Sequence, residues 1–87
     1  MEKIYFPRET EEDCFVRKIL DIGLELASED SGFVKKEFFV NQYYLSGFEA
    51  SFQIWNDLRK KTISHILIFG ENERHLFELE SLFNRIS

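Results

Sequence analysis

The chain has 87 residues, of which 44% are hydrophobic and 16% aromatic, and its formal net charge is −5 at pH 7. This composition excludes an intrinsically disordered chain, which would lack so many aromatic residues, and the length fits one domain with one core. The single cysteine, Cys14, cannot form an internal disulfide, and no apolar run is long enough for a secretion signal or a membrane span. We therefore expect one small domain over residues 1–87 that is cytoplasmic and does not bind membranes.

The acidic residues are concentrated in the first third of the chain. Residues 1–30 hold nine acidic and four basic side chains, which gives −5, whereas residues 31–87 hold seven of each. A negative field repels phosphate backbones and anionic membranes and attracts basic proteins. The charge distribution therefore favours a basic protein as the partner.

The first third of the chain fits a short strand followed by a long helix. Residues 3–6 suit a strand at a sheet edge. Thr10 and Asp13 approximate a capping box at the start of a helix. Behind them, apolar residues recur at helical spacing, namely Phe15, Ile19, Ile22 and Leu26. This pattern predicts an amphipathic helix of about five turns, which Gly23 weakens slightly and residues 28–32 end.

Aromatic and β-branched residues dominate the next segment. Residues 33–45 show a partial apolar–polar alternation, which indicates a strand, and Ser46-Gly47 suits a turn. Residues 48–58 alternate strictly between apolar and polar, as a half-buried strand does. The alternative is a helix, because Ser46 and Glu49 also form a capping box. The alternation and the turn before it favour the strand.

The last third fits a buried strand that turns directly into a helix. Residues 63–69 are rich in β-branched and aromatic types, and Gly70 ends the run. Asn72 is a suitable N-cap for the residues that follow it. Apolar side chains then recur at helical spacing, at Leu76, Leu79, Phe83 and Ile86.

Together these elements predict an α+β fold. It consists of an N-terminal amphipathic helix, a three-stranded antiparallel β-meander and a C-terminal helix packed on the sheet. If residues 47–60 are helical instead, the domain is mainly α-helical.

Two kinds of side chain are candidates for partner binding. The carboxylates in and around the first helix are more numerous than favourable interaction with the helix N-terminus explains. Tyrosine and tryptophan commonly anchor protein interfaces. The alternative interpretations are a plain solvated helix face and an aromatic core. The predicted partner-binding residues are Glu9, Glu11, Glu12, Asp13, Asp21, Glu25, Tyr43, Tyr44 and Trp55.

The sequence offers little support for other chemistry. His65 and His75 match no metal-binding spacing. We expect His65 to be a half-buried residue of a strand and His75 to lie in the first turn of the last helix. The basic segments 35–36 and 59–61 hold the ingredients of a nucleic-acid surface, but the overall charge makes nucleic acid an unlikely ligand. No phosphate-binding loop or activated nucleophile is present. We therefore predict no enzymatic activity, no metal and no cofactor.

The leading functional hypothesis is a non-enzymatic, acidic protein-binding protein of inhibitor or immunity type. It would occlude a basic partner such as a nuclease or toxin, with the carboxylates steering the partner and the aromatic residues anchoring it. The alternative hypothesis is a small structural or regulatory module that self-associates through an aromatic sheet, so that a homodimer is possible.

Overall fold

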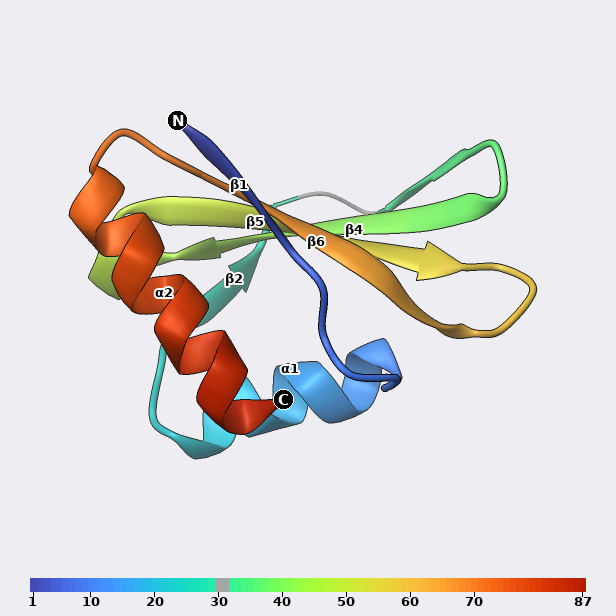
Figure 1. The fold of residues 1–87 in the computed structure, drawn as a ribbon, viewed down its shortest axis with the longest axis horizontal. Helices are drawn as coiled ribbons and strands as arrows, with labels where there is room; N and C mark the ends of the chain where they lie inside the picture. Colours follow the sequence, from blue (N-terminus) through green and yellow to red (C-terminus); the bar gives the residue numbers. More distant parts are fainter. Residues whose placement is uncertain (30–31) are drawn as a thin grey trace.

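The computed structural model describes residues 1–29 and 32–87, and one antiparallel sheet runs through the whole molecule (Figure 1). Two α-helices lie on the same side of this sheet. The elements in chain order are β1 (Glu2–Tyr5), α1 (Glu12–Asp21), β2 (Leu26–Ser28), β3 (Phe33–Lys35), β4 (Phe38–Leu45), the 3-10 turn η1 (Ser46–Phe48), β5 (Ala50–Asp57), β6 (Thr62–Gly70) and α2 (Glu73–Ile86).

The sheet has six strands, all paired in antiparallel fashion, in the order β1-β6-β5-β4-β2, with β3 also paired to β4. The fold is α+β, as predicted, but the prediction of a three-stranded meander is wrong. The meander β4-β5-β6 forms the centre of the sheet, and β1, β2 and β3 extend it on both sides. Strand β1 corresponds to the edge strand predicted at residues 3–6, whereas β2 and β3 are only three residues long, too short for alternation to reveal them.

Residues 47–60 are not helical, so the mainly α-helical alternative is also wrong. Only Ser46–Phe48 form a single 3-10 turn, and Ala50–Asp57 form the strand β5. The alternation in this segment is genuine, because Ala50, Phe52 and Ile54 are buried beneath the helices. The strand interpretation of this segment is therefore confirmed.

Helix α1 is shorter than the apolar periodicity suggested. It ends at Asp21, and Gly23 follows with φ of +87°, a left-handed conformation that glycine adopts at little cost. The amide of Gly23 donates to the carbonyl of Leu20 at 3.0 Å, which closes the last turn. Leu26 then belongs to β2 rather than to the helix. The predicted helix end at 28–32 includes residues 30 and 31, which lie outside the described residues.

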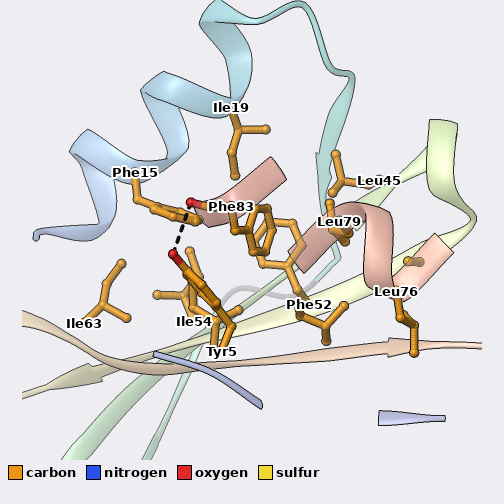
Figure 2. Packing of buried hydrophobic residues seen from close by; sticks show 13 residues of the cluster. Tyr5, Phe15, Ile19, Leu45, Phe52, Ile54, Ile63, Leu76, Leu79 and Phe83 are labelled. Atoms are coloured by element: carbon orange, nitrogen blue, oxygen red, sulfur yellow. Dashed lines mark hydrogen bonds between the residues drawn. The ribbon is translucent and has the colours of Figure 1, made fainter. Parts of the chain in front are cut away.

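The hydrophobic core lies between the helices and one face of the sheet (Figure 2). Phe83 of α2 contacts three aromatic rings, those of Tyr5, Phe15 and Phe52, with ring centroids 5.0–5.7 Å apart. The Tyr5 hydroxyl donates to the carbonyl of Phe83 at 3.1 Å, the dashed line in Figure 2. Since Tyr5 lies in β1 and Phe83 in α2, this bond ties the two ends of the chain together.

The start of α2 agrees with the sequence analysis. The Asn72 side chain accepts hydrogen bonds from the amides of Arg74 and His75, so it caps the helix as predicted. Leu76, Leu79 and Phe83 are buried in the core. At the far end of α2, the Ser87 hydroxyl accepts a hydrogen bond from the amide of Arg8 at 3.1 Å.

The other face of the sheet carries no helix within the described part of the chain (Figure 1). We call it the open face. On β5 it presents Ser51, Gln53 and Trp55, because these residues alternate with the buried ones.

None of the described helices has the length and apolar character that a membrane crossing requires.

Candidate functional site

The nine predicted partner-binding residues do not form one continuous surface. Most of the carboxylates are exposed on or beside α1. Glu12 and Tyr43 instead point toward each other between α1 and the sheet, where the Tyr43 hydroxyl donates to the Glu12 carboxylate. Tyr44 and Trp55 lie on the open face, on the opposite side of the sheet from α1. A single flat partner surface cannot contact all three groups.

Glu12 is a half-buried residue whose hydrogen bonds join α1 to the sheet. Its carboxylate accepts hydrogen bonds from the Asn41 side chain at 2.9 Å, from the Asn56 side chain at 2.7 Å and from the Tyr43 hydroxyl. Burial, followed by the hydrogen bond to Glu12 and its charge, raises the pKa of the Tyr43 hydroxyl above its usual value. Sequence analysis missed this cluster because the three side chains that donate to Glu12 lie 29 to 44 positions after it and the four residues come from three elements.

The remaining α1 carboxylates are exposed and unpaired. Glu11 is the N-cap residue, and Asp13 and Asp21 lie on the outer surface of the helix. The ion pairs found among the described residues, Lys3–Glu80 and Arg74–Glu78, involve none of them. Their negative charge is therefore available to a partner.

Glu9 and Glu25 lie at opposite ends of α1. Glu9 lines a hollow of about 420 Å³ together with Asp57 and Lys60 of the β5–β6 hairpin. Glu25 lies near η1, where it accepts a weak hydrogen bond from the Ser46 hydroxyl at 3.4 Å. The predicted acidic residues thus extend along the whole length of the helix.

Exposed apolar side chains accompany the acidic residues at the end of α1. Leu20 is 50% exposed and Ile22 is 46% exposed, on either side of Asp21. The sequence analysis placed Ile22 on the buried face, which would require the helix to continue beyond it. Because the helix ends at Asp21, Ile22 turns outward. We call the surface formed by Asp13, Leu20, Asp21 and Ile22 the α1 edge.

One basic residue interrupts the α1 edge. Arg17 lies four positions after Asp13 and four before Asp21, so the three side chains share one side of the helix. Arg17 therefore reduces the negative field of the α1 edge.

The open face is largely apolar and aromatic. Several of its side chains are strongly exposed, with Phe6 at 71% and Ile4 at 53%. Cross-strand pairing arranges its residues in three rows that run across the strands: Glu2, Phe69, Ser51, Tyr44 and Ala27; then Ile4, Leu67, Gln53 and Gln42; then Phe6, His65, Trp55, Val40 and Phe33.

Internal contacts order the middle of the open face. The Trp55 ring stacks on the His65 ring, with centroids 5.2 Å apart and the planes tilted by 22°. The Trp55 indole donates to the Gln53 side chain, which in turn donates to that of Gln42. Burial lowers the pKa of His65 below its ordinary value. The side chains in the middle of the open face are therefore held by contacts with one another.

Two basic segments lie at one end of the sheet. The β3–β4 turn and the β5–β6 turn both lie at the right of Figure 1, and a 3.0 Å hydrogen bond from the Leu58 amide to the Glu37 carbonyl joins them at their base. These turns carry the basic segments Lys35-Lys36 and Arg59-Lys60-Lys61 at the same end of the sheet. The Lys35 ammonium lies 5.8 Å from the centroid of the Trp55 ring.

The two histidines lie in different elements, His65 on β6 and His75 in α2. His65 is half-buried on β6, as predicted, and its Nδ1 lies 3.0 Å from the Ser64 hydroxyl. His75 lies in the first turn of α2, with Nδ1 3.0 Å from the Phe48 carbonyl. No three His, Cys, Asp or Glu side chains within residues 1–29 and 32–87 are placed to hold a metal ion.

Comparison with protein-family models, with curated proteins and with solved structures gave no match.

Proposed function

We propose that the chain is a non-enzymatic binding protein of inhibitor or immunity type, which occludes a basic protein such as a nuclease or toxin. The observation that carries this proposal is the α1 edge, where unpaired carboxylates stand beside exposed apolar side chains.

The α1 edge combines the two features that protein docking requires. Leu20 and Ile22 offer apolar area that a partner can cover. Asp13 and Asp21 surround it with negative charge, which speeds association with a basic protein and disfavours acidic ones. The net charge of −5 acts in the same direction at longer range.

The first test is charge reversal at the α1 edge. Asp21→Lys places a cation in the last turn of α1, where the helix tolerates it, and should strongly weaken binding of a basic partner. Glu78→Lys is the control, because it makes the same change of charge at an exposed position on α2, where it also removes the exposed ion pair with Arg74. Arg17→Glu should have the opposite effect and strengthen binding.

The measurement is the capture of binding proteins from a lysate of the native host at low and at high salt. The captured proteins are then identified. The proposal requires a basic protein that the wild type and Glu78→Lys retain at low salt and that Asp21→Lys loses. Inhibition of that protein's activity should follow the same order of variants. A captured protein that responds equally to both reversals, or that is acidic, contradicts the proposal.

A second candidate function is a small structural or regulatory module that self-associates. The open face favours it, since an exposed aromatic sheet surface commonly marks an interface.

A further inference from the structure

Strand β1 forms one edge of the sheet, and among the described residues β6 is its only neighbouring strand. The two strands are antiparallel, and the Gly70 amide donates to the Met1 carbonyl at 3.1 Å. In an antiparallel pair, hydrogen-bonded and non-hydrogen-bonded positions alternate along the strand. Every second residue after Met1 therefore bonds to β6, whereas the amide and carbonyl groups of Glu2 and Ile4 point outward from the edge.

The two sides of this edge differ in chemistry. On the open face, Ile4 and Phe6 are strongly exposed. On the helix side, a hollow of about 320 Å³ lies between β1 and the start of α2, where Glu73 and Leu76 line it together with the first three residues of the chain. A side chain that enters this hollow therefore meets both apolar atoms and carboxylates.

The hollow carries an excess of negative charge. Glu2 and Glu73 are exposed, and within the described part of the chain neither side chain has an ion pair or a hydrogen bond. The Lys3 ammonium is already paired, because it lies 3.9 Å from the Glu80 carboxylate. Even with the amino group of Met1 counted, the unpaired carboxylates outnumber the unpaired cations. The charge therefore favours a basic side chain in the hollow.

We propose that an extended segment of a basic protein adds to this sheet as a further strand beside β1. Its main chain bonds to the outward groups of Glu2 and Ile4, which is the usual source of affinity when a peptide joins a sheet edge. A lysine or arginine of the segment enters the hollow. Apolar side chains at alternate positions point to the other side and cover Ile4 and Phe6.

The added strand runs antiparallel to β1. All strand pairs described in this sheet are antiparallel, and antiparallel pairing is slightly more stable per residue than parallel pairing. The opposite edge of the sheet is divided between β2 and β3, each three residues long. Strand β1 instead offers one continuous run with a hollow beside it. The α1 edge takes no part in this contact, because none of its residues belongs to β1 or lines the hollow.

NMR titration of the untagged chain with a hexapeptide of alternating valine and lysine tests the pairing. The bound peptide gives the Ile4 amide an acceptor. Hydrogen exchange of this amide should therefore slow by about tenfold or more at saturating peptide, while the amides of β3 stay unchanged. A hexapeptide of alternating valine and glutamate should not bind, because it brings carboxylates to the hollow.

Methylation of the peptide amides tests the main-chain bonds without any change to the protein. In the antiparallel arrangement the valines lie opposite Glu2 and Ile4 and exchange hydrogen bonds with them, whereas the lysine amides point away from the edge. N-methylation of the valines should weaken binding by about tenfold or more, and N-methylation of the lysines should change it by less than about twofold. Any other order contradicts the antiparallel pairing.

Removal of one carboxylate tests the hollow. Glu73→Gln should weaken binding of the valine–lysine peptide by about threefold to fivefold, as loss of an exposed ion pair does. Glu71→Gln is the matched control, because it neutralises an exposed carboxylate two positions away that does not line this hollow. Asp21→Lys should leave the peptide bound, so failure of the proposed function would be recognised separately.

Three results would overturn the inference. One is the absence of any chemical-shift change at the highest attainable concentration of the valine–lysine peptide. Another is protection of amides in β2 or β3 in place of Ile4, because the segment would then bind at the opposite edge. The third is an equal effect of Glu73→Gln and Glu71→Gln, which would show that no basic side chain enters the hollow.

Discussion

At the scale of single residues, the neighbours Glu11 and Glu12 differ in the surroundings of their carboxylates. Both were predicted to contact a partner, and both are carboxylates at the start of α1. Glu11 is exposed at the N-cap position, whereas Glu12 accepts hydrogen bonds from Asn41, Tyr43 and Asn56. One position along a helix turns a side chain by about 100°, which is enough to move a charge from solvent to the sheet.

This difference predicts opposite effects on stability. Glu12→Ala leaves the two asparagine amides and the tyrosine hydroxyl without their acceptor, so it should lower the free energy of unfolding by about 1–3 kcal/mol for each group that water cannot reach. Glu11→Ala should change it by no more than about 0.5 kcal/mol, as surface substitutions do. Urea denaturation of the two variants measures this, and equal losses would contradict the role of Glu12 in joining α1 to the sheet.

His65 predicts a dependence of stability on pH. Burial lowers the pKa of His65 in the folded chain, so the unfolded chain binds the proton more tightly. The folded state should therefore be most stable above the ordinary histidine pKa of about 6.5 and lose stability as the pH falls through that value. His65→Gln cannot titrate, and its urea midpoint should fall less between about pH 7 and about pH 5. Parallel pH profiles for the two proteins would exclude His65 as the cause.

At the scale of elements, the boundary of α1 depends on Gly23. A side chain at this position would meet no atom within 4 Å, so only the backbone opposes substitution. Gly23→Ala should cost about 1–2 kcal/mol, because a left-handed conformation is unfavourable for residues with a Cβ. Gly23→Asn should cost less, since asparagine tolerates this conformation. Thermal unfolding of the two variants provides the comparison, and an unchanged melting temperature for Gly23→Ala would show that the helix can end differently.

The sequence predicted those elements whose pattern is local. The alternation of β5, the buried run of β6 and the capped start of α2 all depend on neighbouring residues. The end of α1 was missed because apolar residues at Ile22 and Leu26 continue the helical spacing beyond Gly23. The break between β3 and β4 was missed because Lys36 adopts φ of +55° without the glycine or asparagine that usually marks such a turn.

The candidate surfaces were predictable only in part. The exposed carboxylates of α1 follow from composition and helical position. The Glu12 cluster, the open face and the common position of the two basic segments depend on strand register between distant positions, which one sequence does not provide. The net charge of each third of the chain also gives no indication that the basic segments 35–36 and 59–61 lie at the same end of the sheet.

At the scale of the whole molecule, the sheet predicts a gradient of local stability. Strand β5 is bonded along its length to β4 and to β6, whereas β1 and β3 each have one neighbour. Amides of β5 such as those of Phe52 and Ile54 should therefore exchange with solvent only through global unfolding. Amides of β3 should exchange through local opening, orders of magnitude faster. Hydrogen exchange followed by NMR tests this, and β3 protection equal to that of β5 would contradict it.

The contact between the two chain ends has a consequence for biosynthesis. Strand β1 leaves the ribosome before its partner β6 and before helix α2, which covers both strands. Because β1 cannot pair until β6 has been synthesised, the nascent domain must stay incompletely folded until β6 and α2 have also left the ribosome. Loss of α2 would leave the core face of β1 and β6 uncovered, so a chain cut off within α2 should be degraded by proteases.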